Sequence, residues 1–359
     1  MKLSSIKEII KDAKNGKMFI LVDDKNRENE GDLIIPGSKC NSKNINFMAK
    51  HGRGLICLAL SKKQVDKLSL PLMSSVNKAR MQTAFTVSIE AKKGITTGIS
   101  AFDRARTIKV AINPNVKRKE IVSPGHVFPL VARNGGVLER AGHTEASVDI
   151  SKLANLNPSS VICEVMNEDG RMARYDDLLK FAKKHKLRIA SIEDLISYRL
   201  KNEKLIYNTN TKIINIKKYG KFELKVFKSI LDGSEHYAIV KGKLKFNKSI
   251  RVRVISTNIL NNIINFQKNT VKSSLSYLSK FNNFVLVLIK DQNLNSLKNS
   301  ISSPKNNSIL RYYGVGAQII KDLKIKNMIL VSRSKKRIIG LEGYGIKIKK
   351  QEIIKWKKF

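Results

Sequence analysis

The chain has 359 residues, of which 42% are hydrophobic and 27% are charged, and it carries a formal net charge of +40 at pH 7. This length and hydrophobic content favour two globular domains. No apolar run approaches the roughly 20 residues that cross a bilayer, so we expect a soluble protein without a membrane partner. Three widely spaced cysteines, Cys40, Cys57 and Cys163, indicate neither a disulfide framework nor a cysteine zinc site and favour a cytoplasmic location.

The high positive charge by itself would favour a polyanionic partner, because lysine-rich surfaces release counterions from nucleic acid. Lys, Asn and Ile are abundant everywhere, however, including segments that look like ordinary helices and strands. This pattern is typical of a biased genome composition. We therefore expect a small-molecule substrate rather than a nucleic acid.

The first predicted element is a helix, in which Ser5 and Glu8 form a capping-box pattern before apolar residues at helical spacing and Gly16 suits the end. This is an amphipathic helix rather than a signal peptide. Two further helices are expected, one opened by Asp176 and Asp177 and carrying Leu178, Leu179, Phe181 and Ala182, and one capped by Ser191 with Asp194. Strands are predicted at three apolar segments, MFILVDD (18–24), GLICLAL (54–60) and TAFTVSIEA (83–91). The predicted class is α+β, with an α/β first domain and a smaller α+β second domain.

The composition changes near residue 200, because acidic residues are frequent before this position and only eight follow it. A polar, Asn-rich stretch then precedes a β-rich pattern that begins near Phe222. We predict a first domain at 1–200, a linker at 201–214 and a second domain at 215–359. The Asn-, Lys- and Ser-rich run 293–308 is predicted to be a mobile loop.

Three polar motifs stand out in the first domain. The cluster DDKNRENEGD (23–32) follows an apolar strand, SPGHVFPL (123–130) contains His126, and RAGHTEAS (140–147) contains His143. A solvated turn is the simpler interpretation of an isolated charged cluster, and a lone histidine is more often structural than a ligand. Together, however, the motifs supply an unusual concentration of polar side chains next to apolar strands.

Glu28 and His143 offer the oxygen and imidazole ligands that Mg²⁺ or Mn²⁺ accepts. Arg140 and Thr144 could hold a phosphate by charge-assisted hydrogen bonds, and TTGIS (96–100) is a second amide-rich loop suited to an anion. These residue types describe metal-assisted proton abstraction from a phosphorylated hydroxy-carbonyl compound. Several carboxylates are available as base or acid.

The motifs RENEGD, GRGLICLAL, TAFTVSIEA, TTGISAFDRA, GHVFPL and RAGHTEA occur in this order over residues 5–200 and closely resemble those of 3,4-dihydroxy-2-butanone-4-phosphate synthase. The resemblance implies conversion of D-ribulose 5-phosphate to 3,4-dihydroxy-2-butanone 4-phosphate and formate through an enediol. It also implies Mg²⁺ or Mn²⁺, two ions per site, and a homodimer.

Site residues follow from the same resemblance. It implies metal ligands at Glu28 and His143 and catalytic residues at His126 and Glu164. Whether Glu164 or Asp32 removes the first proton stays open. Cys57 matches a position lining the site, although packing is the simpler reason for a small apolar residue there. The implied substrate contacts are Arg27, Glu28, Asp32, Arg140, Ala141, Gly142, His143, Thr144 and Glu164.

The second half, at 221–255 and 311–347, resembles GTP cyclohydrolase II. That family holds zinc with three cysteines, whereas this chain has no cysteine after Cys163 and carries ISTNILNNIINFQKNT where the ligands belong. We therefore expect no zinc and a catalytically inactive domain. The alternatives are a bifunctional enzyme that also acts on GTP, and a basic module that binds an anion, a nucleic acid or a partner.

Overall fold

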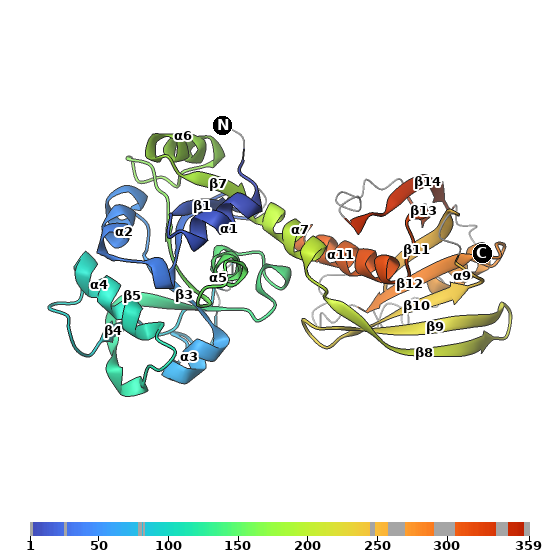
Figure 1. Ribbon diagram of the computed structural model, residues 1–359, viewed down its shortest axis with the longest axis horizontal. Helices are drawn as coiled ribbons and strands as arrows, with labels where there is room; N and C mark the ends of the chain where they lie inside the picture. Colours follow the sequence, from blue (N-terminus) through green and yellow to red (C-terminus); the bar gives the residue numbers. More distant parts are fainter. Residues whose placement is uncertain are drawn as a thin grey trace. The chain divides into compact units, whose positions relative to one another are not determined.

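The structure is a computed structural model that describes residues 3–24, 27–77, 81, 83–244, 248–257, 270–290, 306–334 and 344–354. The chain divides into two compact units, Met1–Tyr198 and Arg199–Phe359, which are described separately (Figure 1). No helix among the described residues has the length and apolar character to cross a membrane.

The first unit is built on a seven-stranded mixed sheet in the order β4-β5-β3-β6-β2-β1-β7. β1 is parallel to β7 and β3 is parallel to β5, whereas the other neighbours are antiparallel. Two of the three predicted strands are confirmed, and of TAFTVSIEA only the last three residues form a strand. The strands are β1 (Phe19–Val22), β2 (Gly31–Pro36), β3 (Cys57–Ser61), β4 (Ile89–Ala91), β5 (Ile121–Ala132), β6 (Ser159–Glu164) and β7 (Arg188–Ser191).

Helices cover both faces of this sheet. α5 contacts five strands on one face, while α2, α4 and α6 pack on the other. The capping box of Ser5 and Glu8 is confirmed at the start of α1. The helices are α1 (Ile6–Lys14), α2 (Ser42–Phe47), α3 (Lys62–Leu68), α4 (Ala101–Ala111), α5 (His143–Leu153), α6 (Tyr175–His185) and α7 (Ile192–Asn202), with shorter turns at Gly37–Lys39, Met48–Gly52, Arg118–Glu120 and Gly136–Leu138.

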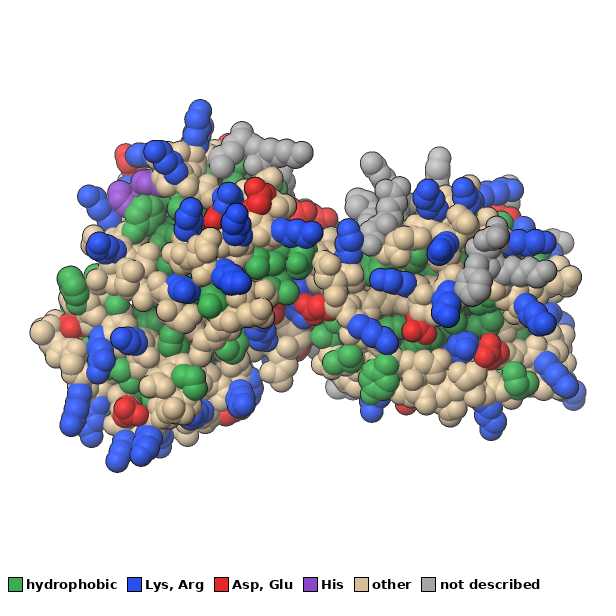
Figure 2. All heavy atoms as spheres, in the orientation of Figure 1, with side chains coloured by type: hydrophobic (Ala, Val, Ile, Leu, Met, Phe, Trp, Pro, Cys, Tyr) green, Lys and Arg blue, Asp and Glu red, His purple; other side chains and the backbone are tan. Residues whose placement is uncertain are grey.

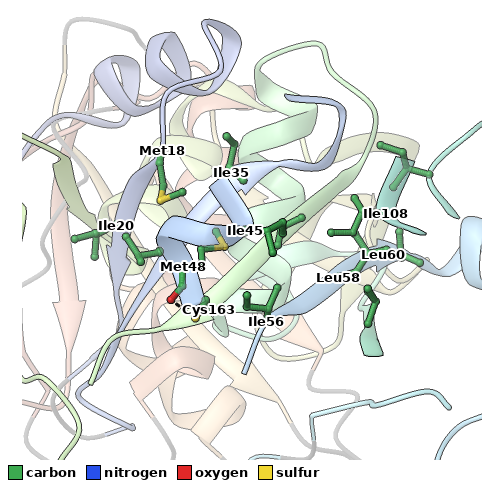
Figure 3. Packing of buried hydrophobic residues seen from close by; sticks show 14 of the residues in the cluster. Met18, Ile20, Ile35, Ile45, Met48, Ile56, Leu58, Leu60, Ile108 and Cys163 are labelled. Carbon is green, nitrogen blue, oxygen red and sulfur yellow. Dashed lines mark hydrogen bonds between the residues drawn. The ribbon is translucent and has the colours of Figure 1, made fainter. Parts of the chain in front are cut away.

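The main core of the first unit lies on the face opposite α5. Figure 3 shows how side chains from β1, β2 and β3 interdigitate there with Ile45 and Met48 from α2 and the turn after it, and with Ile108 from α4. The Cys163 thiol donates a weak hydrogen bond to the Met48 carbonyl at 3.8 Å. Because strand side chains alternate between faces, the residues next to Cys163 face α5 instead.

The second unit contains another seven-stranded mixed sheet, in the order β14-β13-β11-β12-β10-β9-β8 (Figure 1). β11 is parallel to β12 and β13, β13 is parallel to β14, and the remaining pairs are antiparallel. The strands are β8 (Ile206–Ile216), β9 (Gly220–Ser229), β10 (Glu235–Lys241), β11 (Ile250–Thr257), β12 (Phe284–Lys290), β13 (Asn327–Ser332) and β14 (Lys347–Ile353), and the helices are α9 (Thr270–Leu278) and α11 (Asn306–Asp322).

Both faces of the second sheet are buried at its centre. Along β12, Val285 and Val287 join the core that contains α11 residues, whereas Phe284 and Leu286 join the core that contains α9 residues. A strand covered on both sides needs apolar residues at every position, which explains the run FVLVLI. The expected α+β architecture is confirmed.

The predicted linker at 201–214 is wrong. Residues 201–202 complete α7, and most of the remainder forms β8, which pairs with β9. β8 lies at the edge of the sheet and nearly all its side chains are exposed, so it lacks the apolar alternation of a half-buried strand. Most of the predicted loop 293–308 lies outside the described residues, and its last three residues begin α11.

A group of four aromatic rings joins the turn after α2 to the end of α6. The rings of His51 and His185 have centroids 4.8 Å apart, and Phe47 and Phe181 pack beside them. Partial burial lowers the pKa of both imidazoles, and the neighbouring lysines, including Lys184, lower it further. The folded chain therefore binds protons at this pair less readily than the unfolded chain.

We expect acidification to destabilise the first unit through this pair. Between the ordinary histidine pKa near 6.5 and the lowered folded-state pKa, the unfolded chain holds more protons, so stability falls as the pH drops through that window. Because other groups also titrate in this range, the measurement is a comparison with the double variant His51→Phe/His185→Phe. Between pH 7.5 and 5.5 the melting temperature of the wild type should fall relative to that of the variant, and an unchanged difference between the two proteins would contradict the assignment.

Candidate active site

Strand alternation brings two acidic side chains to the α5 face of the first sheet. Leu33 and Cys163 point into the core on the opposite face, so their neighbours Asp32 and Glu164 point toward α5. The register of β2 and β6 places Asp32 directly opposite Glu164. Directly opposite residues have Cβ atoms roughly 5 Å apart, so these two carboxyl groups share one environment.

The acidic turn between β1 and β2 is organised by Asp23. Its carboxylate accepts hydrogen bonds from the Glu28 amide at 3.2 Å and the Glu30 amide at 3.0 Å, and it pairs with the Arg27 guanidinium at 2.6 Å. The same Arg27 nitrogen lies 2.6 Å from Glu28 Oε2. Asn29 takes a left-handed conformation with φ of 55°, which turns the chain between these donors. Asp23 therefore fixes the turn that presents Glu28.

His143 stands at the start of α5 and faces this turn. Its Nδ1 lies 3.9 Å from Glu28 Oε2 and 3.7 Å from Asp32 Oδ1. Asp23, Glu28 and His143 each offer a ligand atom, and these atoms lie within 4.8 Å of one another. The two predicted metal ligands, from positions 115 residues apart, are thus side by side.

Burial and the repulsion between neighbouring carboxylates shift the pKa values of these groups. Burial raises the pKa of the Asp32 carboxyl, and the nearby carboxylates, first Glu164 and then Glu28, raise it further. Burial likewise raises the pKa of Glu164 and of Glu30. Burial lowers the pKa of His143 to about 4, so its imidazole is neutral at pH 7. A neutral imidazole among crowded carboxylates is a donor set that suits a divalent cation.

Glu164 is held in place by the segment before β3. Its Oε2 accepts a hydrogen bond from the Leu55 amide at 2.9 Å. A Cβ atom at Gly54 would lie 2.6 Å from both the carboxylate and the backbone oxygen of Glu164, so only glycine fits there. Cys57 begins β3 nearby, but burial raises the pKa of its thiol and favours a packing role.

Arg140, the first residue of the 140–144 run, is fixed by one buried and two partly buried partners. Its guanidinium pairs with Glu145 at 2.6 Å and donates to the Thr83 hydroxyl at 2.9 Å and to the Met81 carbonyl. Ala141, Gly142 and Thr144 complete the entry to α5, and both Ala141 and Thr144 are buried. Glu145 thus orients the guanidinium that sequence reasoning assigned to the substrate.

His126 lies apart from this group within the described chain. β3 lies between β5, which carries His126, and β6, which ends at Glu164, so the two residues stand on strands roughly 10 Å apart. Its Nδ1 forms a very short contact with Glu90 of β4, and Gly98 packs against both side chains. The amides of Thr96 and Gly98 donate to Asp103, so the TTGIS loop is satisfied internally and the expectation of an open anion loop is wrong for these two amides.

The structure therefore gathers Arg27, Glu28, Asp32, His143 and Glu164 into one site and places His126 in a second polar cluster with Glu90. Sequence reasoning missed three supporting residues. Asp23 was part of the noted acidic cluster without a role, whereas Glu90 and Glu145 gave no local signal because their partners lie on other elements.

Comparison with known proteins supports both resemblances. Residues 7–198 match the family model of 3,4-dihydroxy-2-butanone 4-phosphate synthase, and residues 208–353 match that of GTP cyclohydrolase II. The chain is 42% identical to the 3,4-dihydroxy-2-butanone 4-phosphate synthase of Photobacterium phosphoreum, over 97% of this chain and 98% of that protein. It is also 42% identical to the riboflavin biosynthesis protein RibBA of Aquifex aeolicus, over 99% of this chain and 93% of the relative.

Solved structures agree with this assignment. A two-domain 3,4-dihydroxy-2-butanone 4-phosphate synthase, RibBX from A. baumannii, is similar to 99% of this chain and to all of its own, with a TM-score of 0.85 and 40% identity. A 3,4-dihydroxy-2-butanone 4-phosphate synthase in complex with two magnesium ions matches 56% of this chain and 98% of its own, with a TM-score of 0.53 and 38% identity.

We expect Asp32→Asn to stabilise the metal-free protein. The raised pKa means that the folded state resists ionisation of Asp32, so wild-type stability falls as the pH rises above the ordinary aspartate pKa near 4. Removing the charge should increase the free energy of unfolding by roughly 1 kcal/mol at pH 7.5, as is common for strained active-site positions. Urea unfolding in the presence of a chelator measures this difference between the variant and the wild type. The difference should become smaller as the pH approaches 4.

Asp103→Asn provides a control with the opposite sign. Hydrogen bonds from Thr96 and Gly98 lower the pKa of Asp103, so its charged form stabilises the fold. This variant should lose stability at pH 7.5. If Asp32→Asn also lost stability, the carboxylate cluster would not be under strain.

Proposed function

This chain belongs to the 3,4-dihydroxy-2-butanone 4-phosphate synthase family, an enzyme of riboflavin biosynthesis, and we propose that its first unit converts D-ribulose 5-phosphate to 3,4-dihydroxy-2-butanone 4-phosphate and formate. The observation that carries this proposal is the juxtaposition of Glu28 and His143 beside the paired carboxyl groups of Asp32 and Glu164. The reaction needs a site that binds oxygen atoms and moves protons next to them.

We propose that Glu28 and His143 hold Mg²⁺ or Mn²⁺, two ions per site. Their neutral imidazole and partly exposed carboxylate fit such ions, and the repulsion among the buried carboxyl groups would be relieved by positive charge. Asp23 already accepts three hydrogen bonds and serves better as the anchor of the turn. Bound metal would supply Lewis acidity, making substrate hydroxyl groups more acidic and stabilising an enediolate.

The remaining chemistry belongs to side chains. Asp32 and Glu164 are the two carboxyl groups placed to remove and return protons, and their raised pKa values bring them toward the working pH. Arg140, held by Glu145, and the start of α5 at Gly142 to Thr144 would bind the phosphate and orient the sugar. His126, paired with Glu90, would act as a second proton-transfer group.

We propose that the second unit does not act on GTP. The described part of this unit retains the sheet and its helices, but the sequence offers no thiolate for zinc after Cys163. It contains 35 Lys and Arg residues against eight Asp and Glu between 199 and 359, so a basic binding module is the alternative. Figure 2 shows Lys and Arg scattered over the visible face rather than gathered in one patch, which favours a fold kept for stability or partner docking.

We expect the purified chain to release formate from D-ribulose 5-phosphate in the presence of Mg²⁺ and to release none from GTP. Glu28→Ala and His143→Ala should each reduce this activity by at least 100-fold, since each removes a ligand of the metal. The formate released by the wild type, Glu28→Ala and His143→Ala is quantified under the same conditions. If the wild type released no formate from the sugar phosphate, the proposed function would be contradicted. Formate released from GTP would support the bifunctional alternative.

We also propose that the chain forms a homodimer in the cytoplasm, where its three free thiols would stay reduced. Large apolar side chains are exposed in the segments around β4 and β5, which also hold Glu90 and His126. Phe102 is 76% exposed, and isolated chains rarely present so many such residues together. The others are Leu72, Met73, Val76, Ile99 and Val122.

Phe102→Glu should shift the protein from dimer to monomer, because it introduces a charge into the apolar surface that we propose is covered. Ile213→Glu, at a 64% exposed position of β8, is the matched control and should remain dimeric. Size-exclusion chromatography with light scattering reports the mass of each. A monomeric wild type, or a dimeric Phe102→Glu variant, would contradict the placement of the interface.

A further inference from the structure

Arg174, which lies between β6 and α6, binds the backbone of the acidic turn between β1 and β2. It immediately precedes α6, and its Nη1 donates to the Glu28 carbonyl at 2.6 Å and to the Asn29 carbonyl at 3.0 Å. The same group lies 3.6 Å from the Glu30 carboxylate. One guanidinium thus binds three consecutive residues of the turn, starting at the proposed metal ligand.

The turn is held from two sides. From inside, Asp23 accepts the amides of Glu28 and Glu30. From outside, Arg174 donates hydrogen bonds to the carbonyl oxygens of Glu28 and Asn29, so both the amides and the carbonyl groups of this backbone have partners. This matters because Glu28, Glu30 and the buried carboxyl groups repel one another, which would otherwise spread the turn.

The Arg174 side chain is not required for the start of α6. Its backbone amide donates to the Asp177 carboxylate at 3.1 Å, and Asp177 also accepts from the Asn167 amide. These bonds persist when the side chain is shortened. The side chain is also 48% exposed, so its ion pair contributes little to global stability. Its contacts are concentrated on the turn that carries Glu28.

We propose that Arg174 is a positioning residue for the metal site, which sets the backbone of Glu28 and thereby the affinity for the divalent ion. This inference rests on the proposed function, because it takes Glu28 as a metal ligand. Both carbonyl groups are bound by one nitrogen, Nη1, so a lysine ammonium, which is a single donor group on a differently shaped stem, should restore only part of the interaction. Groups that orient a metal ligand from behind typically change metal affinity by roughly 10- to 100-fold.

The test compares full-length, metal-free wild type with Arg174→Ala, Arg174→Lys and Arg171→Ala. Arg171 is the matched control, since it lies three residues earlier in the connection between β6 and α6, and its side chain is 84% exposed and pairs with Asp169. Mn²⁺ is titrated into each protein and the free ion is followed by electron paramagnetic resonance. Melting temperatures and Mg²⁺-dependent formate release are recorded on the same samples.

We expect Arg174→Ala to bind Mn²⁺ about 10-fold more weakly or worse, Arg174→Lys to be intermediate, and Arg171→Ala to match the wild type. The concentration of Mg²⁺ for half-maximal activity should shift by a similar factor, with little change in melting temperature. Equal Mn²⁺ affinities in Arg174→Ala and Arg171→Ala would overturn the inference. If Arg174→Ala does not fold, Arg174→Lys must still bind more weakly than Arg171→Ala, or the inference falls.

Formate release by the wild type separates this inference from the function on which it rests. A wild type that binds Mn²⁺ and releases formate, with unaltered Arg174 variants, overturns the positioning role alone. A wild type that neither binds Mn²⁺ nor releases formate overturns both.

Discussion

Repulsion among carboxylates is the constraint around which the first unit is organised. Asp32 and Glu164 are neighbours on a buried face, and Glu28 and Glu30 approach them from the adjoining turn. In a medium of low dielectric such charges cannot all be ionised without compensation. The fold provides part of it through Arg27, Arg174 and backbone amides, and what remains is an affinity for added positive charge.

α5 is the scaffold on which this arrangement depends. Every residue of the helix from His143 to Ser151 is buried, including several polar ones. These polar groups are used: Glu145 pairs with Arg140, Asp149 accepts the Val137 amide at 2.8 Å, and Ser151 bonds to Ser160 of β6. A satisfied polar helix is rigid, because any movement would leave buried donors and acceptors unpaired. His143 therefore approaches the acidic turn from a fixed position.

Local sequence pattern was sufficient for the first helix cap and for two of the three predicted strands of the first unit. The acidic turn, the start of α5 and the first helix cap are short-range features, and the comparisons confirm the two families. Long-range pairings were not accessible: Arg174 binds carbonyl groups 146 and 145 residues earlier, and nothing near Arg174 in sequence indicates this. The linker prediction failed at β8 because an exposed edge strand contains the same polar residues as a linker.

The buried position of Cys163 protects its thiol from oxidation and alkylation. Its thiol is fully buried next to Glu164 and donates to the Met48 carbonyl, and burial raises its pKa, as it does for Cys57. Peroxide and alkylating reagents attack the thiolate and need access to it, and both conditions fail here. This sulfur is thus kept out of redox chemistry, so oxidants should spare the side chain that packs on the reverse side of the strand beside Glu164.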